Sequence, residues 1–116
     1  MEKVTGIGGV FFKASDAETL RRWYQDNLGI DVSEWGGATF GDTVWSIFKD
    51  STKYFEPSKQ PFMVNYRVAD LDAMVAQLRD AGVEADDPQE TEYGRFAWAS
   101  DPEGNRFELW QPPSGE

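Results

Sequence analysis

The chain has 116 residues, 40% of them hydrophobic and 15% aromatic, so it is long and apolar enough to fold as one compact domain around a single core. Acidic residues outnumber basic ones by 21 to 11, and the formal net charge of −10 repels phosphate backbones, which excludes nucleic acid as an expected partner. The absence of cysteine and histidine excludes disulfides, thiolate nucleophiles and Ser-His or Cys-His catalytic arrangements.

The first half of the chain begins with a predicted strand over residues 7–14. A helix should follow, because residues 15–18 have the S-x-x-E form of a capping box and Gly29 supplies a stop. Between these signals, apolar residues recur at helical spacing: Leu20, Trp23, Tyr24 and Leu28. Three short β-like runs at 31–35, 38–40 and 43–49 come next, separated by glycine-containing turns, so this half has the order β-α-β-β-β.

The second half repeats this order after a segment, 51–60, whose polar and proline-rich composition predicts a linker. A strand over 62–68 precedes a helix that Asp70 opens and Gly82 closes. The apolar stripe of this helix comprises Leu71, Met74, Val75 and Leu78. Further strands begin at Val83 and run to residue 111, with a turn at 101–105.

Aligning residues 14–16 with residues 68–70 places strand on strand and helix on helix, so the chain consists of two copies of one unit. We expect a single domain spanning 1–116, with modules at about 5–50 and 61–112. Neither copy can bury both a sheet face and a helix stripe alone. The two should therefore share a core and curl their other sheet faces around a cavity.

Two motifs resemble those of a known family. Residues 93–95 and 101–112 are similar to the closing motif of the vicinal oxygen chelate superfamily of glyoxalase-like, bleomycin-resistance-like and dioxygenase proteins: a glycine, an Asp-Pro-Glu-Gly-Asn turn, and a strand that carries a glutamate. Residues 23–29 resemble its first-helix signature. The resemblance implies an α+β fold of two tandem βαβββ modules that form a cupped mixed sheet with helices on the outer face. It implies no single activity, because the family includes lyases, dioxygenases, isomerases and non-catalytic drug-binding proteins.

The resemblance also implies where a metal would lie, on four strand positions that usually carry His, Glu or Gln. In this sequence they become Gly9, Ser46, Met63 and Glu108. Only Glu108 is a firm ligand, whereas zinc, iron and nickel sites need three or four N, O or S ligands. We therefore expect neither a metal nor another cofactor.

Strand alternation predicts which side chains face the cavity. The predicted ligand-binding residues are Phe11, Phe48, Met63, Asn65, Arg67, Arg106, Glu108 and Trp110. The aromatic members suit a flat ligand, although the same side chains would also serve as packing. A second set is assigned to the helix-facing core: Trp23, Tyr24, Trp45 and Ile47. Two roles remain open for Glu108, an anchor or acid for a ligand and a carboxylate neutralised by an arginine. Arg67 is either a clamp for an anion or, as we favour, the partner of Glu108.

Three functions are consistent with this sequence. The first is a metal-independent protein that binds a flat apolar or cationic small molecule, with Glu108 as its polar anchor. The second is a glyoxalase-like enzyme of lyase or dioxygenase type, with a diverged metal site or with Glu108 as a metal-free, catalytic acid/base near Arg67 and Tyr54 or Tyr93. The lack of histidine disfavours it. The third is an interaction or regulatory subunit.

The remaining expectations concern assembly and location. The family resemblance and the exposed sheet edges predict a homodimer. No apolar run approaches the ~20 residues of a membrane span, and the N-terminal residues lack the apolar core of a signal peptide. We therefore expect a cytoplasmic protein without a membrane partner.

Overall fold

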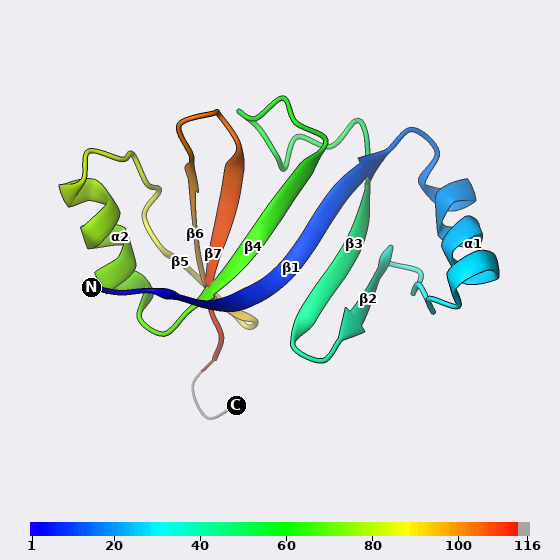
Figure 1. Ribbon diagram of the computed structural model, residues 1–116, viewed down its shortest axis with the longest axis horizontal. Coiled ribbons are helices and arrows are strands. Elements are labelled where there is room, and N and C mark those ends of the chain that lie inside the picture. The colour runs from blue at the N-terminus through cyan, green and yellow to red at the C-terminus, as the bar shows by residue number, and fades with distance from the viewer. Residues whose placement is uncertain (114–116) are drawn as a thin grey trace.

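A computed structural model, which describes residues 1–113, shows a mixed seven-stranded sheet and two helices (Figure 1). The last three residues of the domain predicted at 1–116 lie outside the described part. The elements are β1 (Val4–Ala14), α1 (Ala17–Leu28), β2 (Gly37–Phe40), β3 (Thr43–Lys49), β4 (Phe62–Val68), α2 (Leu71–Asp80), β5 (Gln89–Thr91), β6 (Gly94–Ser100) and β7 (Arg106–Gln111). The predicted α+β class and mixed sheet are confirmed.

The two halves meet at the centre of the sheet, whose strand order is β2-β3-β1-β4-β7-β6-β5. There β1 pairs with β4 in antiparallel orientation. On one side β1 runs parallel to β3, which pairs with β2. On the other side β4 runs parallel to β7, which pairs with β6, and β6 pairs with β5. Each half therefore pairs its first strand with a parallel and then an antiparallel neighbour, and the second half adds β5 at its edge.

Two strand predictions are wrong: the strands expected from Val83 begin only at Gln89, and residues 31–35 form a loop rather than a strand. The Ser33 N–H donates to the carbonyl of Gly37, and the Gly36 N–H donates back to the carbonyl of Ser33, each at 2.9 Å. Gly36 adopts a φ of 95°, which a residue with a Cβ rarely tolerates. These local bonds use the backbone groups that a ladder would need, so the first half has the order β-α-β-β.

Both helices begin at an aspartate. Asp16 caps α1, since its carboxylate accepts from the N–H of Thr19 at 3.0 Å and from the Thr19 hydroxyl at 2.8 Å. The capping-box pattern that placed the cap at Ser15 is therefore one residue out of register, because the Asp16 carboxylate satisfies both donors at once. Asp70 caps α2, and Gly29 ends α1 in the left-handed conformation, as predicted.

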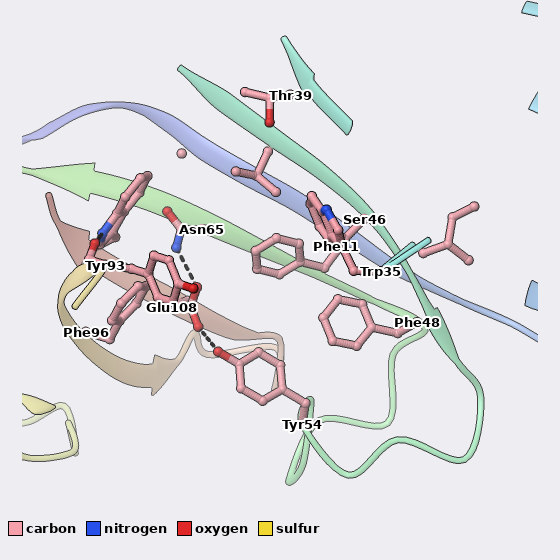
Figure 2. Close-up of a pocket in the computed structure, with 14 residues that line it drawn as sticks. Phe11, Trp35, Thr39, Ser46, Phe48, Tyr54, Asn65, Tyr93, Phe96 and Glu108 are labelled. Carbon is pink, nitrogen blue, oxygen red and sulfur yellow. Dashed lines mark hydrogen bonds between the residues drawn. The ribbon is translucent and has the colours of Figure 1, made fainter. Parts of the chain in front are cut away.

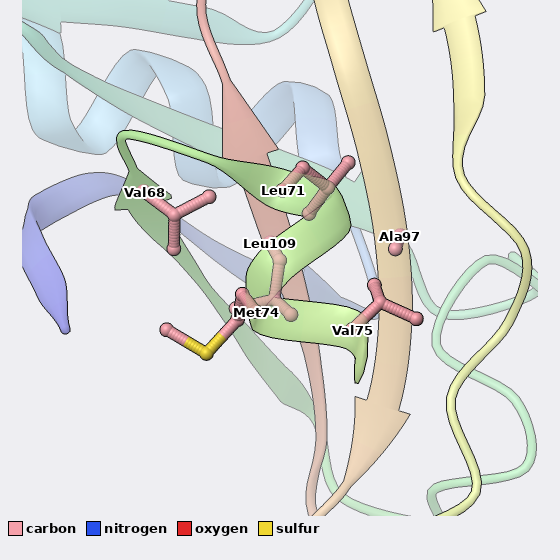
Figure 3. Close-up of a cluster of buried hydrophobic side chains, with 6 residues drawn as sticks. All are labelled: Val68, Leu71, Met74, Val75, Ala97 and Leu109. Carbon is pink, nitrogen blue, oxygen red and sulfur yellow. The ribbon is translucent and has the colours of Figure 1, made fainter. Parts of the chain in front are cut away.

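The helices lie on the outer face of the sheet. A buried cluster joins α2 to the strands beneath it and comprises Val68, Leu71, Met74, Val75, Ala97 and Leu109 (Figure 3). Ala97 and Leu109 alternate along β6 and β7 with side chains that point to the opposite face. Within the described residues, no helix is long and apolar enough to cross a membrane.

The first helix packs differently, because α1 buries none of its residues. Tyr24 contacts Trp45 edge-on at a centroid distance of 4.9 Å and Phe12 at 6.2 Å, so Tyr24 and Trp45 lie on the helix side of the sheet as predicted. Trp23 is 51% exposed and Leu28 is 61% exposed. The assignment of Trp23 to the core is therefore wrong. Its ring contacts Tyr24 edge-on and remains half exposed.

Candidate functional site

The face of the sheet opposite the helices encloses a cavity of about 700 Å³ (Figure 2). Half of the residues in its wall are aromatic. The wall is formed by Gly8, Phe11, Trp35, Thr39, Val44, Ser46, Ile47, Phe48, Tyr54, Asn65, Tyr93, Phe96, Glu108 and Trp110. Within this wall Glu108 alone carries a formal charge. The cavity therefore combines apolar, aromatic surface with one acidic group, which is the composition expected of a small-molecule site.

Glu108 lies on β7 and is only 2% exposed. Its carboxylate accepts hydrogen bonds from Asn65 Nδ2 at 2.5 Å, from Trp98 Nε1 at 2.9 Å and from the hydroxyl of Tyr54. All three donors are neutral, and no lysine or arginine of residues 1–113 forms an ion pair with Glu108. A buried carboxylate without a countercharge is costly, so a ligand that brings a positive charge gains more here than at the surface.

Tyr54 reaches Glu108 from the segment that connects β3 to β4. Its ring stacks on Phe48, with centroids 5.7 Å apart and planes 5° from parallel, and meets Trp98 edge-on. Burial, together with the adjacent Glu108 carboxylate, raises the pKa of the Tyr54 phenol far above its ordinary value. Tyr54 therefore stays protonated and acts as a hydrogen-bond donor to Glu108.

Asn65 is held in one orientation by Glu108. Because the carboxylate only accepts, Asn65 presents Nδ2 to it, and Asn65 Oδ1 is buried without a hydrogen-bond donor in the described structure. Oδ1 lies against Gly8, where a register shift in β1 brings the backbone close. A Cβ at Gly8 would overlap Oδ1 and lie 2.9 Å from Trp110 Cε3, so this close approach requires glycine.

The structure places most of the predicted ligand-binding residues in the cavity wall: Phe11, Phe48, Asn65, Glu108 and Trp110. Met63 shares their face of the sheet but is not in the wall. It is fully buried in a cluster with Phe11 and Phe55. Phe55, which belongs to the segment predicted to be a linker, is fully buried in the same cluster.

The predicted arginine residues also fall outside the wall. Arg67 lies over the ring of Trp110, 4.8 Å from the centroid, and Arg106 lies over the ring of Trp98 at 5.7 Å. The favoured pairing of Arg67 with Glu108 is therefore wrong, because stacking on tryptophan holds the guanidinium away from the carboxylate. Arg106 approaches Asp86 instead, at 3.6 Å.

Comparison with known proteins supports this reading of the fold. Residues 9–110 match the family model described as glyoxalase-like domain. The chain belongs to this glyoxalase-like family. The match covers most of the chain and confirms the resemblance to the vicinal oxygen chelate superfamily. Among curated protein sequences, none matches significantly.

Solved structures share the glyoxalase-like fold at low sequence identity. Methylmalonyl-CoA epimerase from Mycobacterium tuberculosis is 22% identical with a TM-score of 0.67, over 95% of this chain and 89% of the epimerase. A methylmalonyl-CoA epimerase in complex with methylmalonyl-CoA and NH4+ is 20% identical with a TM-score of 0.69, over 98% of this chain and 99% of that one. Catechol 2,3-dioxygenase is 21% identical with a TM-score of 0.68, over 97% of this chain and 41% of the dioxygenase. These likenesses establish the fold alone.

The four positions of the family's metal do not fit a metal in this glyoxalase-like domain. At Gly9 the ring of Phe11 occupies the space, since a Cβ there would lie 2.8 Å from Phe11 Cε1. Met63 is fully buried. Besides Glu108, Ser46 is the only polar side chain among the four positions. Both carboxylate oxygens of Glu108 already accept side-chain hydrogen bonds. Within residues 1–113, no three His, Cys, Asp or Glu side chains gather in a group that would hold a metal ion.

Several residues of the site were absent from the sequence-based site: Gly8, Trp35, Thr39, Val44, Phe96 and the Glu108 partner Trp98. Phe96 and Trp98 alternate along β6 just before the turn, and this alternation contained the signal needed to place them. Trp35 lies in a loop, where no strand alternation indicates which way its side chain points. Ile47, predicted to face the helices, also borders the cavity.

Proposed function

We propose that this protein binds a flat, cationic aromatic molecule without using a metal. The observation that carries the proposal is the buried Glu108 carboxylate, which lies in an aromatic cavity and faces only neutral donors. Transfer of a lone cation into an apolar cavity is unfavourable. A carboxylate at its end offsets that cost, and the two charges then stabilise each other.

The aromatic wall favours a flat molecule. Phe96 and Trp110 stack with centroids 6.0 Å apart and planes 5° from parallel, and Phe48 and Phe11 line the other side. Such surfaces bind rings by dispersion and attract cations to their faces. The described wall contains no lysine or arginine. A ligand that carries phosphate groups is therefore disfavoured.

One contact favours a second candidate, a metal-free acid/base enzyme. Glu108 lies in direct contact with the hydroxyl of Tyr54, whose pKa is raised. Glu108 would accept a proton from a bound substrate while the hydrogen bonds from Tyr54 and Trp98 hold its carboxylate in place. Chemical analysis of the bound molecule after incubation with the protein distinguishes the two candidate functions, because a binding protein leaves the molecule unchanged and an enzyme converts it.

Substitution of Glu108 by glutamine tests the binding proposal with two probes of similar shape, benzamidine as the cation and benzyl alcohol as the neutral molecule. We expect Glu108→Gln to weaken benzamidine binding roughly tenfold to a hundredfold, because the variant loses a charge-assisted hydrogen bond. Binding of benzyl alcohol should change by less than about threefold. Titration calorimetry measures both affinities, and addition of EDTA should leave them unchanged.

The matched control is Glu103→Gln, which removes the same charge from an exposed turn. If Glu103→Gln weakens benzamidine as much as Glu108→Gln, the long-range field of an acidic protein explains the affinity and the site does not. An affinity that requires an added divalent metal would contradict metal-independent binding.

A further inference from the structure

We propose that Tyr54 is a gate on this site, and that the ligand carries a positively charged N–H donor which replaces the Tyr54 hydroxyl on Glu108. The inference rests on the proposed function and specifies its ligand more narrowly. It also assigns a role to the segment between β3 and β4, which the sequence presents only as a connection.

Tyr54 covers the group that a ligand would need to reach. Glu108 borders the cavity but is 2% exposed, and the Tyr54 hydroxyl is bonded to its carboxylate. Figure 2 shows Tyr54 extending from the connecting segment, with its hydroxyl directed at Glu108. A donor on a ligand therefore competes with the Tyr54 hydroxyl for the Glu108 carboxylate.

The connecting segment holds its neighbour Phe55 firmly while leaving Tyr54 able to turn. Phe55 is fully buried against Phe11 and Met63, whereas Tyr54 is 40% exposed. The Phe55 carbonyl accepts from the Ser58 N–H at 2.9 Å, which fixes the backbone beyond Phe55. Rotation of the Tyr54 side chain into solvent would break its bond to Glu108 and its stacking on Phe48 without moving Phe55.

The place that Tyr54 vacates defines the ligand. With Tyr54 turned away, Glu108 keeps the bonds from Asn65 and Trp98 and regains one accepting position. The space beside Phe48 is then open to another aromatic ring. A flat ring that bears an amidinium or a primary ammonium group fills both places, whereas a quaternary ammonium has no N–H with which to replace the hydroxyl.

The test compares Tyr54→Phe with the wild-type protein. The variant keeps the ring and its stacking on Phe48 but removes the hydroxyl that competes for Glu108. We expect benzamidine to bind about tenfold more tightly to Tyr54→Phe, because a hydrogen bond to a carboxylate no longer has to be broken. Phenyltrimethylammonium, a flat cation without N–H groups, should bind the wild-type protein more weakly than benzamidine does.

Tyr66→Phe is the matched control, since Tyr66 packs against Phe107 outside the cavity wall. It should leave both affinities unchanged. Tyr54→Ala vacates the ring position as well, so its gain in benzamidine affinity should be at least as large as that of Tyr54→Phe.

The outcomes separate this inference from the proposed function. If the wild-type protein binds benzamidine through Glu108 but Tyr54→Phe and Tyr54→Ala bind it equally or more weakly, the gate is wrong and the proposed function stands. If only the Tyr54 variants bind benzamidine, the gate is supported in its strongest form. If neither the wild-type protein nor the variants bind, the proposed function is wrong and the gate falls with it.

Discussion

In the C-terminal half of the sheet, α2 buries Leu71, Met74 and Val75 against the strands, whereas α1 in the N-terminal half buries no residue. The two helices share an aspartate cap and occupy equivalent positions in their modules. Aliphatic side chains at i, i+3 and i+4 lie flat on the outer face in α2. In α1 the bulky ring of Tyr24 meets Trp45 edge-on. The same element plan therefore yields a packed layer in one half and a loose one in the other.

The exposed apolar surface follows the same division. Most large exposed hydrophobic residues of the described chain lie before α2: Met1, Val4, Ile7, Val10, Trp23, Leu28, Trp35, Phe40, Tyr54 and Phe62. After α2 the set contains only Tyr93. The cavity wall takes the polar residues Thr39 and Ser46 from the N-terminal half, but its hydrogen-bonded pair Asn65 and Glu108 comes from the C-terminal half. We infer that the C-terminal half supplies most of the stability and the polar anchor.

The largest expected effect is the difference in stability loss between two leucine truncations. Leu71→Ala in α2 removes a fully buried side chain and should lower the free energy of unfolding by about 2–5 kcal/mol. Leu28→Ala in α1 truncates a side chain that is 61% exposed and should cost less than about 1 kcal/mol. Urea denaturation measures both. Equal losses would show that α1 is packed as tightly as α2 in solution, and the contrast between the halves would then be wrong.

Much of the fold could be predicted from the sequence, because its signals were local. Strand alternation placed Glu108 and Trp110 on the cavity face, and helical spacing placed Leu71 and Met74 on the sheet. A turn at Gly36 was predicted, but it begins already at Ser33, so residues 31–35 were misassigned as a strand from their β-like composition.

The candidate site was predicted less completely, because its decisive contacts join distant parts of the chain. Tyr54 and Glu108 are 54 residues apart, and alternation cannot indicate where a side chain from a connecting segment will lie. Arg67 shares the face of Glu108, as predicted, but face alone did not decide between a carboxylate and the ring of Trp110. Which of several partners on the same face of the sheet a side chain contacts depends on the three-dimensional packing.

The next effect concerns assembly. We expect a homodimer in which apolar surface of α1 is buried between two copies, because Trp23 is 51% exposed and Leu28, at the end of the helix, is 61% exposed. Light scattering should give twice the monomer mass, and Trp23→Glu should raise the dissociation constant about tenfold or more, a cost of roughly 1.4 kcal/mol. Ala81→Glu, which adds the same charge at the exposed end of α2, is the control. A monomeric mass over a wide concentration range would contradict the predicted dimer, and the exposed apolar residues of α1 would then have no partner surface.

The smallest expected effect is a difference in acid sensitivity between two exposed carboxylates, Asp16 in the N-terminal half and Asp101 in the C-terminal half. Asp101, between β6 and β7, accepts from the side chain and N–H of Asn105 and from the N–H of Glu103, and these bonds hold its pKa below the ordinary value of an aspartate. Asp16 accepts from the N–H and hydroxyl of Thr19, which also lowers its pKa. A depressed pKa in the folded state means that the stabilisation is complete above the unfolded value of about 3.9 and is lost as pH falls through the folded pKa.

Asparagine remains a good helix cap, so Asp16→Asn should change stability little, whereas Asp101→Asn leaves one oxygen for three donors and should cost more. Urea midpoints between pH 7 and pH 2 test this: the loss from Asp101→Asn should shrink below pH 4, and a loss that stays constant with pH would show that the turn does not depend on the ionised carboxylate.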